Sequence, residues 1–229
     1  FLNLLLDQDI NNFVFSSSSS VYGEQEIVPI NEDAVLNPLT SYGRSKQMIE
    51  GVLQDYNVAY DFRSISLRYF NACGADLESE VGQVKDATHV IARVLESIIN
   101  NDTFTLFGTD YDTEDGTCVR DYTHVWDLAL AHVKAVDYLV NGGQTEIINL
   151  GAGQGQSVQD IVDEVLNVVE RLPEITYGER REGDPTKVIA DIFKAKHILE
   201  WVPKYSDLNT IIETAWKWYN SKNFIGRTE

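Results

Sequence analysis

The sequence of 229 residues predicts an α/β protein, with part of a doubly wound parallel sheet followed by a smaller carboxyl-terminal α/β region. Three observations lead to this prediction. Short apolar runs typical of buried strands alternate with longer amphipathic runs typical of helices. The connections between strand-like runs are long enough for the crossover helices that parallel strands need. Hydrophobic residues make up 43% of the chain, with 15 glycines and 5 prolines, which is the composition of a globular protein.

A strand, a helix and a second strand open the predicted order. Residues 12–16 (NFVFS) are an apolar run ending in small polar residues, as a buried strand does on reaching a loop, and residues 62–70 (FRSISLRYF) have the same character. Between them, helix-start signals at residues 38–41 precede side chains that recur at helical spacing. We expect this stripe to face the protein interior, and its members are Tyr42, Lys46, Ile49, Leu53 and Tyr56.

Three further helices and two further strands are expected. They are predicted as helices over residues 125–139, 158–166 and 208–219, and as strands over residues 145–150 and 174–177. Ser157 and Asp160 stand at the spacing of a capping box, which favours a helix start between them. The mixture of strands and helices with crossovers is what supports a mostly parallel sheet.

Composition and charge exclude several classes of function. Asp and Glu number 36 against 18 Lys and Arg, so the formal net charge is −18 and a nucleic-acid backbone would be repelled. No stretch approaches the roughly 18 apolar residues of a membrane span, and the first residues do not read as a signal peptide. Cys73 and Cys118 lack the Cys or His neighbours of a metal site or a disulfide framework. We therefore expect a cytoplasmic protein that uses no metal, nucleic acid or membrane.

A run of five serines, Ser16 to Ser20, follows the first predicted strand. A flexible linker would have polar neighbours, whereas this run lies between Phe13–Phe15 and Val21–Tyr22. Serines at the carboxyl end of a buried parallel strand point their hydroxyl groups into the crevice where ligands of open α/β sheets bind. The alternative is that each serine only caps the next turn.

Tyr42 and Lys46 stand four residues apart on the predicted helix, so both side chains project from one face. A phenol ionises near pH 10, and an ammonium group one helical turn away stabilises the phenolate and brings base catalysis closer to neutrality. The alternative is a surface helix with a lysine whose stem lies along it. Ser18, about two dozen residues upstream at the end of a predicted strand, favours the catalytic interpretation.

This order of Ser, Tyr and Lys resembles the short-chain dehydrogenase/reductase superfamily, and further motifs resemble its extended, nucleotide-sugar branch and the UDP-glucose 4-epimerases within it. The resemblance covers essentially the whole chain. The motifs are FSSSSSVYG (15–23), SYGRSK (41–46), LRYFNACGA (67–75), FGTDYDTEDGTCVRDYTHVWDLA (107–129), INLGAGQGQSV (148–158) and RREGDPTKVIAD (180–191).

The resemblance implies NAD as cofactor, a UDP-hexose as substrate, a Rossmann-like sheet and a homodimer. It implies that Ser18 and Tyr42 are the catalytic hydroxyl groups and that Lys46 is the cation on the cofactor side. Other residues near the cofactor would be Ser16, Ser17, Tyr69 and Phe70. The substrate would contact Ser18, Tyr42, Asn71, His89, Val90, Thr105, Leu106, Phe107, Arg120, Arg181, Asp184 and Val188. The chemistry agrees, since arginine forks suit phosphate oxygens and a carboxylate accepts bonds from ribose hydroxyl groups.

The resemblance also implies two regions. Residues 1–72 would form the carboxyl-terminal part of a Rossmann-type domain with the catalytic residues, and residues 73–229 mainly a nucleotide-sugar-binding region, with about 122–150 returning to the first domain. Family members begin with a glycine-rich turn for the NAD diphosphate, which this sequence lacks. GAGQGQ (151–156) imitates that turn, but its glycine spacing is wrong. We expect a fragment or a natural remnant, and expect the 229 residues alone to bind NAD poorly and turn over little or nothing.

The activity implied is interconversion of UDP-glucose and UDP-galactose through a 4-keto sugar, an isomerase reaction of galactose metabolism. Val188 stands where a bulky Tyr restricts some members to these sugars, so N-acetylated sugars are a further expectation. Ser19 and Ser20 occupy the places of the Asp and Glu with which related dehydratases expel water, which disfavours dehydration. Decarboxylation and a non-catalytic UDP-sugar-binding role stay open as alternatives.

Overall fold

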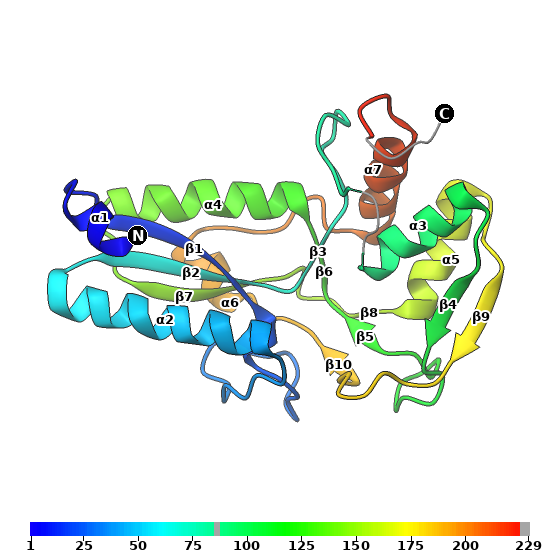
Figure 1. The fold of residues 1–229 in the computed structure, drawn as a ribbon, viewed down its shortest axis with the longest axis horizontal. Coiled ribbons are helices and arrows are strands. Elements are labelled where there is room, and N and C mark those ends of the chain that lie inside the picture. Colours follow the sequence, from blue (N-terminus) through cyan, green and yellow to red (C-terminus); the bar gives the residue numbers. More distant parts are fainter. Residues whose placement is uncertain (85–87, 225–229) are drawn as a thin grey trace.

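The computed structural model describes residues 1–84 and 88–224. Its first part is a parallel sheet in the order β1-β2-β7, made of β1 (Asn12–Ser18), β2 (Arg63–Tyr69) and β7 (Glu146–Leu150). Helix α2 (Ser41–Tyr60) covers one face of this sheet and α4 (Val125–Val140) the other, as Figure 1 shows. The α/β class with parallel strands and crossover helices is therefore confirmed.

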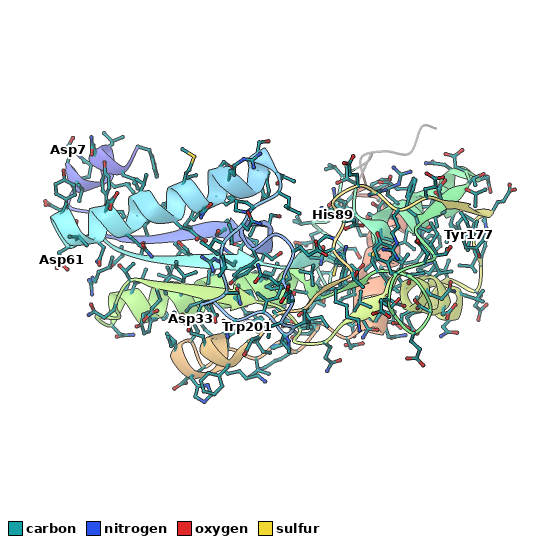
Figure 2. The ribbon with its side chains drawn as sticks, turned by 90° about the horizontal axis from the view of Figure 1, so that it is seen from below. Asp7, Asp33, Asp61, His89, Tyr177 and Trp201 are labelled. Atoms are coloured by element: carbon teal, nitrogen blue, oxygen red, sulfur yellow. The ribbon has the colours of Figure 1, made fainter. Side chains whose placement is uncertain are left out.

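The core of this part lies between the sheet, α4 and α6 (Phe193–Ile198). Ile65 and Leu67 from β2 and Ile148 from β7 are fully buried in it. Trp201, which follows α6 and is labelled in Figure 2, is buried there as well, and its indole nitrogen donates to the carbonyl of Asp127. The segment after α6 thus packs on the same sheet as the first strands of the chain.

The second part gathers three helices around its own core at the other end of the molecule (Figure 1). The helices are α3 (Val90–Asn100), α5 (Val158–Val169) and α7 (Leu208–Asn220), beside the parallel pair β4 (Phe104–Phe107) and β9 (Ile175–Gly178). Their apolar faces meet because each helix has a stripe of aliphatic or aromatic side chains at helical spacing.

Short strands join the two parts. β3 (Asn71–Cys73) follows β2 almost directly and pairs in parallel with β6 (Tyr122–His124), which leads into α4. A second small sheet has the order β10-β5-β8, with β10 (Lys187–Val188), β5 (Val119–Arg120) and β8 (Gln156–Ser157). The remaining elements are α1 (Leu2–Leu6) and the 3₁₀ helix η1 (Ser19–Val21). Because β5 and β6 are adjacent in sequence, the chain between residues 119 and 124 is tied to both sheets.

The main predicted elements are confirmed at their expected places. The predicted helix over residues 158–166 is α5, and both bonds of its capping box are present: Asp160 N–H donates to Ser157 Oγ, and Ser157 N–H donates to the carboxylate of Asp160. The helix start at residues 38–41 is also confirmed, since Thr40 Oγ1 accepts from Gly43 N–H. Helices α3 and α6, strand β4 and the strands of two or three residues were not predicted.

The predicted inward stripe of α2 is wrong for two of its five members, since Leu53 is buried and Lys46 and Tyr56 are half-buried. Tyr42 and Ile49 are 53% and 39% exposed, and of the predicted stripe only Leu53 is fully buried. The face that does turn inward carries Gly43, Glu50 and Leu53. Periodicity of apolar residues identified this face only in part, because the helix is anchored to the sheet partly through a buried carboxylate.

Gly43 brings the start of α2 against the chain that follows β1. A Cβ atom at this position would lie 2.4 Å from the carbonyl oxygen of Ser20 and 2.9 Å from Cβ of Pro38. We expect Gly43→Ala to lower the free energy of unfolding by about 1–3 kcal/mol, because overpacking against backbone outweighs the better helix propensity of alanine. Gly51→Ala is the matched control, since nothing lies within 4 Å of its Cβ and it should be neutral or stabilising. Urea unfolding of both variants measures this, and equal effects would contradict it.

Strand β1 forms the outer edge of its sheet in the described part of the chain, and α4 runs beside it. Val133, Val136 and Val140 on α4 are exposed, and β1 carries no charged residue that would discourage pairing with a further strand.

Within residues 1–84 and 88–224, no helix is long and apolar enough to cross a membrane, and no group of three His, Cys, Asp or Glu side chains is placed to hold a metal ion.

Candidate functional site

The serines at the end of β1 have different environments. Ser17 is buried, and its hydroxyl group donates to Glu50 Oε1 over 2.5 Å. Ser18 is partly buried; its Oγ accepts from Ser20 N–H over 3.2 Å and so caps η1. Ser16 is exposed at the open end of the strand. Ser17 therefore serves packing, whereas Ser16 and Ser18 can reach a ligand.

Lys46 stands directly over this strand end. Its Nζ donates to the carbonyl oxygen of Ser16 over 2.8 Å and lies 5.0 Å from the ring centroid of Phe15 and 5.3 Å from that of Tyr42. The fold thus brings the predicted Tyr and Lys pair to the carboxyl end of β1, with the ammonium group beside the phenol ring. Tyr42 is half-exposed, so its side chain is accessible to solvent.

Tyr69 ends β2 next to this group. Its hydroxyl group bonds to Ser16 Oγ over 2.8 Å and to Nε2 of His132, whose Nδ1 bonds to the carbonyl of Leu128. Burial raises the pKa of Tyr69, and the neighbouring Tyr42 adds to this. Phe70 turns the other way and is buried, with its ring centroid 6.5 Å from that of Tyr22. Tyr69, and not Phe70, therefore lies at the strand end where Lys46 binds Ser16.

A cavity of about 200 Å³ opens between β3, β4 and the start of α3. Nine of the residues predicted to contact substrate line it: Asn71, His89, Val90, Thr105, Leu106, Phe107, Arg120, Arg181 and Asp184. They come from segments spread over more than 110 residues of sequence, so the fold has gathered them. Ser18 and Tyr42 lie outside this wall, and Val188 packs beside the apolar cluster that contains Phe70.

The cavity carries an ion pair and a stacked guanidinium. Arg120 Nη2 pairs with Asp184 Oδ1, and the side chain of Arg120 is only 12% exposed. Tyr111 donates its hydroxyl to Asp184 at 3.5 Å. The guanidinium of Arg181 lies 4.4 Å from the ring centroid of Phe107, a cation–π contact. Two positively charged forks and an exposed aromatic ring are suited to phosphate oxygens and a flat heterocycle.

The amino terminus of α3 points at the same cavity. His89 is the N-cap residue but makes no side-chain capping bond, so the first backbone N–H groups of this helix are not capped by it. His89 is labelled in Figure 2, where it lies near the junction of the two parts of the molecule. Arg93, one turn into α3, also lines the cavity and was not predicted. The signal that could have found it is the lone cation in the apolar run 90–99.

Asp121 explains both the position of Asn71 and the GAGQGQ turn. The backbone N–H groups of Ala152, Gly153 and Ala190 all donate to its carboxylate. In the turn that imitates a dinucleotide fingerprint, the N–H groups of Ala152 and Gly153 therefore bind a side chain of this protein and not a phosphate. The Asp121 carbonyl accepts both the backbone N–H and the side-chain amide of Asn71, which fixes Asn71 at the cavity wall.

Burial raises the pKa of the Asp121 carboxyl to about 6, against three N–H bonds that act to lower it. Between about pH 4 and pH 6 the folded chain then holds a proton that the unfolded chain has released. The contribution of Asp121 to the free energy of unfolding should therefore fall as the pH rises through that window, by up to about 3 kcal/mol. Urea unfolding of the wild type relative to Asp121→Asn from pH 4 to pH 7 measures it. A difference that is flat with pH would contradict it.

Comparison with known proteins agrees with this geometry. Residues 1–151 match the model of the NAD dependent epimerase/dehydratase family. The UDP-glucose 4-epimerase of Rhizobium meliloti (strain 1021) is 46% identical over 224 residues, which cover 97% of this chain and 68% of that protein. The crystal structure of UDP-glucose 4-epimerase from Brucella ovis in complex with NAD has a TM-score of 0.91 at 41% identity, covering 94% of this chain and 67% of that one. The structure of the UDP-Glc/GlcNAc 4-epimerase from Campylobacter jejuni has a TM-score of 0.80 at 36% identity, covering 96% and 67%.

The parallel sheet with a Tyr and Lys pair at its carboxyl edge, beside an arginine-lined cavity, defines a nucleotide-binding protein of the Rossmann-like class. The chain belongs to the NAD dependent epimerase/dehydratase family. It spans about two thirds of the length of the curated relatives that it matches.

The residues at the end of β1 fit one end of NAD. Lys46 supplies a cation, and Tyr42 and Tyr69 supply hydroxyl groups and ring faces, where a ribose and a nicotinamide would lie. The dinucleotide diphosphate needs a cradle of free backbone N–H groups. Those of Ala152 and Gly153 in the GAGQGQ turn do not fit, because both already donate to the Asp121 carboxylate.

Proposed function

We propose that this chain carries the catalytic hydroxyl groups and the substrate nucleotide site of an NAD-dependent UDP-glucose 4-epimerase. The observation that carries the proposal is the single cavity that combines Arg120, Asp184, Arg181 stacked on Phe107, and the start of α3. Two guanidinium groups and a helix amino terminus suit a diphosphate, and Thr105 to Phe107 form a strand edge on which uracil can lie. The similarity to UDP-glucose 4-epimerases over most of the chain supports the same proposal.

The nucleotide half of the substrate is bound strongly so that the sugar can remain free. Arg120 and Arg181 hold the diphosphate, Asp184 accepts from a ribose hydroxyl, and Asn71 donates to a phosphate oxygen. Because these contacts stop at the diphosphate, the hexose can turn about it and present either face to the strand end.

Proton transfer falls to the residues on β1 and α2. Tyr42 takes the proton from the C4 hydroxyl of the hexose, Ser18 orients that hydroxyl, and Lys46 places a positive charge beside the phenol ring. NAD, when bound beside them, supplies the redox chemistry at C4. After the hexose has rotated about the diphosphate and presents its other face, Tyr42 returns the proton to the oxygen of the 4-keto sugar.

Ser19 and Ser20 leave the site without the carboxylates that an elimination of water would use, so we place epimerisation ahead of dehydration. Val188, a short side chain beside the Phe70 cluster, favours acceptance of UDP-GlcNAc as well. We further propose galactose metabolism in the cytoplasm as its setting. A homodimer through α2 is supported by the exposed side chains of Met48, Ile49 and Val52.

The function can be tested in two steps. Isothermal titration of the 229-residue chain should show binding of UDP and UDP-glucose but much weaker binding of NAD. A chimera with the amino-terminal segment of the Rhizobium meliloti relative placed before Phe1 should convert UDP-glucose to UDP-galactose, detected by chromatography. UDP-sugar binding without turnover in a folded chimera that binds NAD would favour the alternative, a non-catalytic UDP-sugar-binding protein. Absence of UDP binding would overturn the proposal.

A further inference from the structure

Helix α2 is held to the rest of the protein by very few buried side chains. Of its 20 residues, only Gly43, Glu50 and Leu53 are fully buried. One of these three is a carboxylate, although a helix on a sheet normally buries aliphatic side chains. Glu50 is not among the residues assigned to substrate or cofactor, so its burial needs another explanation.

Glu50 pairs with Arg68 on β2 inside the protein. Arg68 Nε donates to Glu50 Oε1 over 3.0 Å and Arg68 Nη2 to Oε2 over 2.7 Å, a bidentate pair whose side chains are 1% and 3% exposed. The hydroxyl of Ser17 donates to the same carboxylate over 2.5 Å. One carboxylate of α2 therefore binds both β1 and β2.

The arginine end of the pair is itself fixed. Arg68 Nη1 donates to the Tyr22 hydroxyl over 2.8 Å, and that hydroxyl donates to Asn149 Oδ1 over 2.6 Å. Asn149 lies on β7 and is fully buried, and its amide donates to the carbonyl of Ile30. The network thus extends from α2 across all three strands of the sheet.

A buried ion pair contributes little net stability compared with apolar side chains of similar size, but it demands one geometry. An apolar face lets a helix slide or rotate at small cost, whereas a bidentate pair does not. Glu50 lies four residues after Lys46, so both point to the same side of α2. Lys46 binds the backbone of Ser16 while Glu50 binds the side chain of Ser17, so the two anchors grip neighbouring residues of β1.

We propose that the Glu50–Arg68 pair is a positioning device that fixes α2 against β1 and β2, so that Lys46 and Tyr42 stand correctly at the strand end that carries Ser18. Glu50 and Arg68 touch no reacting atom. Their effect on catalysis rests on the proposed function, whereas their effect on the position of Lys46 does not.

Lys46 provides a direct measurement on the 229-residue chain. The rate at which a water-soluble acylating reagent modifies Lys46 is followed by mass spectrometry, relative to the exposed Lys217 on α7. In Glu50→Met/Arg68→Met the apolar pair should retain most of the stability, yet the relative rate should rise about fivefold, the factor expected when a hydrogen bond of ordinary strength is lost. Leu53→Ala is the matched control, since it removes a buried apolar contact of the same helix and should leave the relative rate unchanged.

The outcomes are decisive. An unchanged relative rate in the folded double variant, or an equal rise in Leu53→Ala at matched stability, would overturn the proposal and leave the pair a packing element. If the double variant does not fold, Glu50→Gln decides in its place, since it keeps the length but removes the charge and puts an amide N–H donor where Oε2 accepts from Arg68 Nη2. In the chimera, the double variant should lower kcat with little change in KM for UDP-glucose. A chimera inactive with the wild-type pair would contradict the proposed function, and the labelling result would still decide the positioning role.

Discussion

Replacing Arg120 by methionine is expected to weaken UDP binding by about 100-fold, the effect of truncating one partner of a largely desolvated charge pair. Arg120 is 12% exposed and pairs with Asp184, so the substitution removes a donor to the diphosphate and leaves the carboxylate without this cation. Methionine keeps most of the stem, so the packing of β5 against β10 should survive. Isothermal titration with UDP measures the loss.

Arg63→Met is the matched control for this experiment. Arg63 is the first residue of β2, at the opposite end of that strand from Tyr69, and the substitution changes the net charge by the same amount. Its UDP affinity should therefore remain within about twofold of wild type, because Arg63 does not line the cavity and its partly exposed charge is screened by salt. Equal losses in both variants would mean that general charge, and not the Arg120 and Asp184 pair, governs binding. No loss in a folded Arg120→Met would remove the cavity as the diphosphate site.

The strands and caps of the first part could be predicted because their signals are local. Residues 12–16 and 62–70 alternate with a helix whose cap is Thr40, and each of these features lies within a few residues of sequence. The buried face of α2 could not be predicted in this way. It depends on Arg68, 18 residues from Glu50, and no apolar pattern reports a buried carboxylate that meets its partner on another element.

The candidate site shows the same division. The resemblance placed Arg120, Arg181 and Asp184 in one site, and the fold brings all three to one cavity. Arg93 was missed because it comes from a helix that the sequence did not predict. Strands such as β10, with two residues, are too short for any periodicity. The interpretation of GAGQGQ as a turn without a dinucleotide rested on glycine spacing, and the physical reason, capture of its amides by Asp121, needed the structure.

Removing the hydroxyl group of Tyr42 is expected to have the largest effect of all. In the active chimera, Tyr42→Phe should lower kcat for UDP-glucose epimerisation by about 10²–10⁴-fold, the usual contribution of a positioned acid–base group. KM should change little, because the nucleotide contacts lie in the cavity of Arg120 and Asp184, whose wall does not include Tyr42. The aromatic ring at position 42 stays in place beside Lys46, so the substitution tests only the contribution of proton transfer by the hydroxyl group.

Tyr56→Phe on the same helix is the control, since its hydroxyl group contacts Asn3 at the far end of α2 and not the strand end. It should leave kcat within about twofold of wild type and cost at most the stability of one exposed hydrogen bond. If Tyr42→Phe retained wild-type turnover, another group would have to move the C4 proton. Tyr69 would then be the first candidate, because it shares the strand end with Ser16, although burial raises its pKa and so disfavours its phenolate. A Tyr42→Phe/Tyr69→Phe double variant would separate the two.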